Sequence, residues 1–184
     1  MRYTLNGQPL AYGGLVDADG VGHPAMVLEL WSDQELARIG VVRTADPAPS
    51  VAELAAALVG DVNAERDRRI SGGFALNGKT FQTRQSDREN ISTMGVQAQL
   101  AVLGGAQVGD LHWHGDPDNA FRWITGDNTT VELDAQGMVE LFERGVTFKS
   151  ALTFTARAKK DWLLNPTRTR EELAAFDVAA DWPQ

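Results

Sequence analysis

The stretch that decides the fold is residues 65–91, ERDRRISGGFALNGKTFQTRQSDRENI. Gly72-Gly73 interrupts a helical pattern, because glycine readily adopts the left-handed conformation that ends many helices. Asn77-Gly78 separates two short apolar runs, and this dipeptide is the strongest short signal for a β-hairpin. The stretch therefore predicts a helix end, a short hairpin and the start of a second helix.

Both helices that flank this hairpin have predicted starting points. Ser86 is followed three residues later by Glu89, the pattern of a capping box, so we expect the second helix over residues 86–103. Ser50 and Glu53 form the same pattern ahead of the first helix. Apolar residues then recur at three- and four-residue spacing, which is typical of one buried helix face.

The other elements are predicted from turn, capping and periodicity signals. In chain order we expect a hairpin over 2–12, a strand over 25–31, a short helix between Ser32 and Gly40, a strand over 111–114, a hairpin over 121–133, a helix over 135–164 and a short helix after Thr169. The fold class is therefore α+β, with a Trp-rich hairpin and a long C-terminal helix.

The predicted elements divide the chain into four parts. A small N-terminal β-rich unit covers residues 1–43, and residues 44–50, which contain two prolines and no large apolar residue, form a linker. The main α+β domain spans residues 51–165. Residues 166–184 are expected to form a C-terminal tail that docks on a neighbouring surface.

Composition excludes several classes of protein. The 184 residues include no cysteine, so a disulfide scaffold and thiol catalysis are excluded. The net charge of −8 disfavours nucleic-acid binding, which requires a basic face. No apolar run approaches the roughly 20 residues that cross a bilayer, so we expect no membrane insertion, and the N-terminus has no apolar core of a secretory signal.

The central stretch also carries a family resemblance. The runs RDRRISGGF, NGK and FQTRQSDRENIS resemble a domain of unknown function that recurs in tailed-bacteriophage tail and tail-fibre-assembly proteins, with the match extending from about residue 51 to about residue 163. The segment HPAMVLELWSDQELARIGVV, residues 23–42, is similar to the leader of many phage tail proteins. The resemblance implies a structural component of the virion, a tail fibre or tip protein assembled in the bacterial host cytoplasm.

Two alternative functions remain open. The first alternative to a fibre or tip protein is a tail-fibre assembly chaperone that is absent from the virion. The second is a receptor- or glycan-binding tail protein. In the second case Trp113 and Trp123 stack on a sugar ring, since aromatic faces suit carbohydrates. Burial of these aromatic residues in the core is the competing interpretation. We expect no enzyme, because the sequence has no G-x-S-x-G, H-E-x-x-H or P-loop motif.

Other tail proteins and further copies of the chain are the expected partners, with a homotrimer as the usual symmetry of fibres. Helical stripes are expected to supply the interface between copies, and core packing within one chain is the alternative. The interface candidates are Ile91, Met94, Ala98, Leu141, Phe148 and Leu152.

One pair of residues suggests a metal site. His112 and His114 flank Trp113, and residues two apart in a strand point to the same face. Two imidazoles on one face suit a transition metal. The arrangement resembles the His-x-His pairs that bind an axial metal in trimeric phage fibres. The alternative is two half-exposed histidines beside a buried tryptophan, and no other cofactor is expected.

Overall fold

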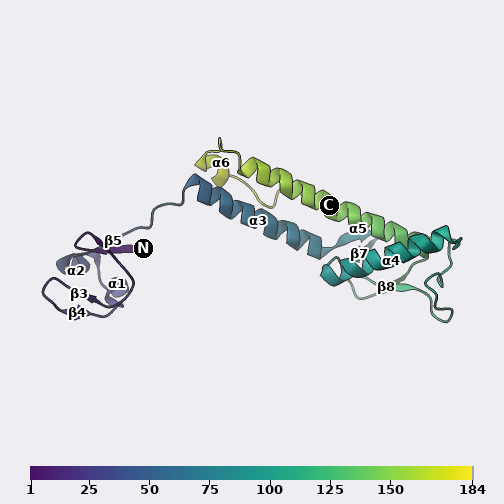
Figure 1. Ribbon diagram of the computed structural model, residues 1–184, viewed down its shortest axis with the longest axis horizontal. Coiled ribbons are helices and arrows are strands. Elements are labelled where there is room, and N and C mark those ends of the chain that lie inside the picture. The colour runs from purple at the N-terminus through teal and green to yellow at the C-terminus, as the bar shows by residue number, and fades with distance from the viewer. Residues whose placement is uncertain (184) are drawn as a thin grey trace. The chain divides into compact units, whose positions relative to one another are not determined.

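The computed structural model describes residues 1–183 and confirms the α+β class (Figure 1). The chain separates into two compact units, Met1–Pro49 and Ser50–Gln184. The boundary lies inside the expected linker. Each unit has its own hydrophobic core.

The first unit is built on a three-stranded antiparallel sheet of order β2-β1-β5. Its elements are β1 (Arg2–Leu5), β2 (Gln8–Leu10), β3 (Leu15–Val16), β4 (Gly22–His23), α1 (Val27–Leu30), α2 (Asp33–Arg38) and β5 (Val41–Thr44). The expected Asn-Gly turn connects β1 and β2, with Asn6 and Gly7 both at positive φ, 51° and 81°. Ser32 and Glu35 form the predicted capping box of α2.

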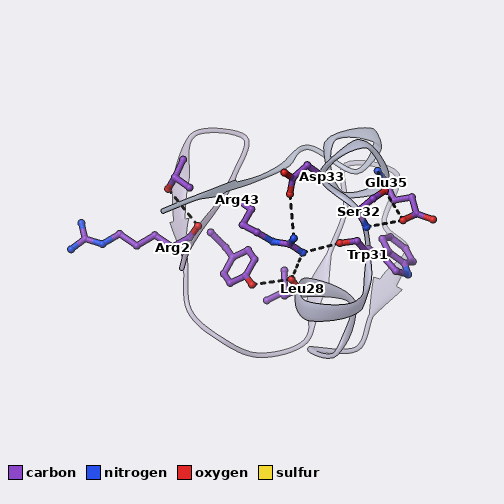
Figure 2. Close-up of polar contacts among 9 residues, drawn as sticks. Arg2, Leu28, Trp31, Ser32, Asp33, Glu35 and Arg43 are labelled. Atoms are coloured by element: carbon purple, nitrogen blue, oxygen red, sulfur yellow. Dashed lines mark hydrogen bonds and ion pairs between the residues drawn. The ribbon is translucent and has the colours of Figure 1, made fainter. Parts of the chain in front are cut away.

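Arg43 ties the sheet of this unit to α1 (Figure 2). Its Nη2 donates to the carbonyl oxygens of Leu28 at 2.6 Å and Trp31 at 2.8 Å, and its Nη1 lies 3.3 Å from Asp33. Carbonyls at a helix C-terminus lack partners within the helix, so the guanidinium satisfies them. The predicted strand over 25–31 is wrong. Residues 27–30 instead form the short helix α1, whose backbone N–H groups donate to carbonyls three and four residues back, at Pro24, Ala25 and Met26.

The second unit contains three long helices and two hairpins. Its elements are α3 (Val51–Gly72), β6 (Phe74–Leu76), β7 (Lys79–Phe81), α4 (Gln85–Leu103), β8 (Arg122–Ile124), β9 (Thr130–Glu132), α5 (Ala135–Leu163) and α6 (Arg170–Ala174). The deciding stretch folds as expected, with Gly73 at φ 87° ending α3 and Asn77-Gly78 turning the β6–β7 hairpin.

One predicted helix start is wrong. Helix α4 begins at Gln85 rather than at Ser86, because the carboxylate of Asp87 accepts the backbone N–H of Arg84 at 3.0 Å. Glu89, the expected partner of Ser86, instead accepts a bond from the Gln85 side chain at 3.2 Å. An acidic residue three positions after the cap therefore decides the start.

The long helix α5 is shared by two clusters of buried residues. In one cluster it packs against α3, through residues that include Val62, Leu152 and Ala156. In the other it packs against α4 and the β6–β7 hairpin, through residues that include Ala98 and Leu141. Figure 1 shows α3 beside the C-terminal part of α5 and α4 beside its N-terminal part.

The expected interface residues lie mainly inside these clusters. Ile91, Ala98, Leu141 and Leu152 are buried within the chain, so core packing replaces the interface for them. Met94 and Phe148 are half-buried and pack against the same clusters. The helical periodicity of these residues was predicted correctly, but the residues that pack against them belong to the same chain rather than to another copy.

The C-terminal tail docks on its own unit. Leu173 of α6 and Trp182 are buried in the cluster between α3 and α5. The indole of Trp182 lies under the guanidinium of Arg69 at 5.4 Å and near the ammonium of Lys159 at 5.5 Å. The surface on which the tail docks is therefore formed by α3 and α5 of the same chain.

Candidate binding groove between α4 and the β8–β9 hairpin

A groove of about 610 Å³ lies between α4 and the β8–β9 hairpin. Phe121, Trp123 and Ile124 line it from the hairpin side, and Asn90 and Thr93 line it from α4. A cleft of this size with mixed apolar and polar walls is typical of small-molecule and sugar sites.

The β8–β9 hairpin is held in place by the neighbouring β6–β7 hairpin. The backbone N–H of Gly126 donates to the carbonyl of Thr80 at 2.7 Å. Lys79 pairs with Asp127 at 3.0 Å. A Cβ at Gly126 would lie 3.3 Å from the Thr80 carbonyl, so glycine permits the close approach of the two backbones. The groove wall therefore depends on the deciding stretch of the sequence.

Asp127 organises the turn at the end of this hairpin. Its carboxylate accepts bonds from the hydroxyls of Thr125 at 2.6 Å and Thr129 at 2.7 Å, and from the Thr129 N–H at 3.1 Å. These two hydroxyl bonds, and then Lys79, hold the pKa of Asp127 well below its usual range. The acid is used for turn structure, as carboxylates in turns commonly are.

Only one of the two tryptophans expected at a glycan site lines the groove. Trp123 forms its wall together with Phe121, with ring centroids 6.4 Å apart. Trp113 does not line the groove; like Trp123 it packs against the core cluster, and its indole N–H donates to the Leu133 carbonyl at 2.9 Å. Trp113 therefore occupies a structural position in the core, which was the alternative to a sugar-binding role.

The polar wall of the groove was not anticipated from the sequence. Asn90 and Thr93 are exposed on the helix face that continues from Asp87. Asp87 also pairs with Arg84 at 3.1 Å, at the groove edge. The only available signal was the three-residue spacing of polar positions on the predicted helix, which ordinary solvated helices share.

The histidine pair does not occupy a strand. Residues 111–115 form turns, and the backbone N–H of His112 donates to Asp110 Oδ1 at 2.8 Å. His112 is exposed, whereas the His114 ring packs near Phe121 at 5.3 Å and Trp113 at 5.9 Å. The shared face that the metal hypothesis required is therefore absent from this segment. Within residues 1–183, no three His, Cys, Asp or Glu side chains are grouped to hold a metal ion.

A row of exposed apolar side chains follows the outer face of α4. Val96, Leu100 and Leu103 are 48%, 64% and 84% exposed, and their spacing of four and three residues places them along one face. A shallow depression beside Leu103 is lined by Val102 and by Val139 of α5. We call Val96, Leu100 and Leu103 the α4 row.

Together these features define an α+β helix–hairpin–helix unit that presents an aromatic groove and an apolar helix face. A family model matches residues 53–180, nearly all of this unit, and the chain belongs to that family, the Domain of unknown function (DUF4376). No curated protein matches the chain, and no solved structure does. None of the helices described here has the length and apolar character needed to cross a membrane.

Proposed function

We propose that this protein is a non-catalytic structural component of a tailed-bacteriophage virion, a tail fibre or tip protein. In this proposal it is made in the host cytoplasm and assembles as a homotrimer alongside other tail proteins. The family resemblance of residues 65–91 supplies the phage context, and those residues form the centre of the second unit.

The α4 row is the observation that supports assembly. Soluble monomers rarely expose extended apolar patches, and such patches usually mark contacts with other proteins. Val96, Leu100 and Leu103 stand on a regular helix and would suit packing against the same helix of another copy. Burying them on assembly would remove their apolar surface from water, which favours association.

Size-exclusion chromatography with light scattering tests the trimer. We expect three chain masses for the natural protein and one chain mass for Leu100→Glu or Leu103→Glu, with unchanged helical circular dichroism because both side chains are exposed. Gln97→Glu is the matched control, since it adds the same charge to an exposed site off the row and should leave a trimer. A natural protein that stays monomeric at all concentrations contradicts trimer assembly.

Mass spectrometry of purified virions separates a structural component from an assembly chaperone. A structural component is recovered at a constant ratio to the major tail protein after density-gradient purification. Recovery from the lysate but not from the virion would instead support the chaperone.

The groove favours a second candidate, binding of a glycan receptor. Aromatic rings stack on sugar faces, and the amide of Asn90 and the hydroxyl of Thr93 can bond sugar hydroxyls. On an array of bacterial surface glycans we expect selective binding that Trp123→Ala reduces roughly tenfold or more. Phe154→Ala, which removes an aromatic ring 72% exposed on α5, is the control. Equal binding by both variants contradicts a role for the groove.

A further inference from the structure

A separate half-buried pocket of about 160 Å³ lies where the end of α3, the start of α4 and the middle of α5 meet. Its inner wall is apolar and includes Ile70, Ile91 and Phe148. Ser92, Val146 and Lys149 are exposed and form its outer edge. The pocket does not share a lining residue with the groove beside Trp123.

Gly145 leaves the inner wall of this pocket open. It lies in the middle of α5, where glycine is among the least favourable residues for a helix. A Cβ at this position would meet Phe74 ring atoms at 3.5 and 3.7 Å and Ile91 Cγ2 at 3.9 Å, which are ordinary contact distances. Alanine would therefore fit and improve the helix, but it would place a methyl group beside Ile91 in the pocket wall.

Two cations stand at the pocket without carboxylate partners. Arg88 is positioned by a 2.6 Å bond from its Nη1 to the Thr83 carbonyl. Neither Arg88 nor Lys149 forms an ion pair with any carboxylate in the described part of the chain. Asp67, whose charge interacts with Arg88, is itself bound by Arg66 at 2.8 Å. An acidic chain thus keeps two positive groups beside an apolar cavity.

We propose that this pocket binds a compact apolar group that carries a carboxylate. An apolar cavity of about 150 Å³ accepts a benzene ring, so one aromatic or branched aliphatic group fills the available volume. The carboxylate would lie at the edge, where Arg88 and Lys149 supply charge-assisted hydrogen bonds. The group comes either from a free small carboxylate or from a peptide with an acidic residue next to an apolar one, and the site stands whether or not the protein belongs to a virion.

Chemical-shift mapping on the full-length, isotope-labelled protein tests the chemistry and its source. The probes are 3-phenylpropionate, its uncharged amide, propionate, and the peptide acetyl-Asp-Phe-amide. We expect saturable shifts at Ile91, Ser92 and Gly145 with 3-phenylpropionate, and weaker binding of the amide and of propionate. Stronger binding of the peptide assigns the ligand to a partner chain, and stronger binding of 3-phenylpropionate assigns it to a small molecule. Binding of neither 3-phenylpropionate nor the peptide, or binding of the amide as tight as that of 3-phenylpropionate, overturns the proposal.

Matched variants test the wall and the edge separately. Gly145→Ala should weaken 3-phenylpropionate roughly tenfold while keeping the fold, since one methyl group in a pocket has effects of this order. Gly60→Ala is its control, because a Cβ at this mid-helix glycine of α3 meets nothing within 4 Å.

For the charge, Lys149→Gln should weaken 3-phenylpropionate roughly two- to fivefold and leave binding of the amide unchanged. Arg144→Gln, an exposed cation of α5 that does not line the pocket, is the control and should change neither. Unchanged affinity in both Gly145→Ala and Lys149→Gln overturns the assignment of this pocket even if the probes bind elsewhere.

Discussion

Glu65 shows how one side chain connects distant parts of the second unit. Its carboxylate accepts bonds from Arg68 and Arg69, each at 2.7 Å. Arg69 in turn donates to the Ala179 carbonyl at 3.1 Å and lies over Trp182. The charged end of α3 therefore helps to hold the C-terminal tail in place through Arg69. The ion pairs of Glu65 itself are made within α3.

These arginines lower the pKa of Glu65 to about 2, with the hydrogen bond from Arg68 as the largest cause and burial opposing it. The group has a pKa near 4.3 in an unfolded chain, so its contribution to stability is present above that pH. The contribution is lost as the pH falls from about 4 toward 2, because the unfolded state then binds the proton more readily.

Glu65→Gln should accordingly lower Tm by about 2 °C at pH 7. The variant should also lose less stability than the natural protein between pH 5 and pH 2.5. Thermal unfolding followed by circular dichroism at four pH values measures both effects. Asp161→Asn removes an exposed pair with Arg157 and should leave Tm nearly unchanged. An equal fall in Tm between pH 5 and pH 2.5 for the natural protein and Glu65→Gln would contradict this account.

At the scale of elements, α4 and α5 pack closely together where Gly95 lies. Gly95 is buried against Phe142, and a Cβ at Gly95 would approach the Phe142 Cβ and Cγ to 2.5 Å. No real side chain is accommodated at that distance without movement of a helix. The glycine that weakens α4 as an isolated helix is therefore required by its packing.

Gly95→Ala should destabilise the second unit by about 1–3 kcal/mol, because overpacking forces the helices apart. Gly60→Ala, on the open surface of α3, should instead stabilise it by up to about 1 kcal/mol. Urea unfolding of the two variants gives both values. Stabilisation by Gly95→Ala would show that α4 and α5 are not in close contact.

Local signals predicted elements well where one short segment determines the structure. The Ser50–Glu53 box begins α3 as expected. The helices expected over 135–164 and after Thr169 also form, as α5, which Asp134 caps, and α6, which a Thr169–Glu172 box begins. Residues 25–31 and 111–114 were predicted as strands but fold as a helix and turns. Both segments are too short to show a distinctive period. Residues 27–30 form backbone bonds within residues 24–31, whereas the Leu111 carbonyl accepts the N–H of the more distant Phe121.

The candidate sites were predicted less completely than the fold. Trp123 was recognised because an aromatic side chain is chemically distinctive, although it is only half-buried rather than exposed, whereas Asn90 and Thr93 resemble any solvated helix face. The groove exists only because β8 lies beside α4, and the pocket at Gly145 requires three helices to meet. Such arrangements depend on packing between segments far apart in sequence, which periodicity does not encode.

At the scale of the whole molecule, the two units are expected to fold independently. The first has its own core of Leu15, Val27, Leu28, Leu36 and Val41. The second contains both remaining clusters and the whole of the family match, residues 53–180. A unit of about 50 residues without disulfides has little apolar surface to bury and should be the less stable of the two.

A chain of residues 50–184 should therefore keep its native structure. We expect its amide resonances away from the linker to overlay those of the full-length protein, and its unfolding to remain cooperative. Residues 1–49 alone should unfold at a temperature roughly 10 °C or more below that of residues 50–184. Loss of dispersed resonances from residues 50–184 would show that the first unit is needed for folding.

The docking of Trp182 beside α3 has a consequence for synthesis on the ribosome. The cluster that contains Ala55 and Val62 is complete only when Leu173 and Trp182 have emerged. At elongation rates of about 5–20 residues per second the intervening residues take on the order of ten seconds to make. During that interval the apolar face of α3 is incompletely covered, so we expect the nascent chain to expose a surface of the kind that ribosome-associated chaperones bind.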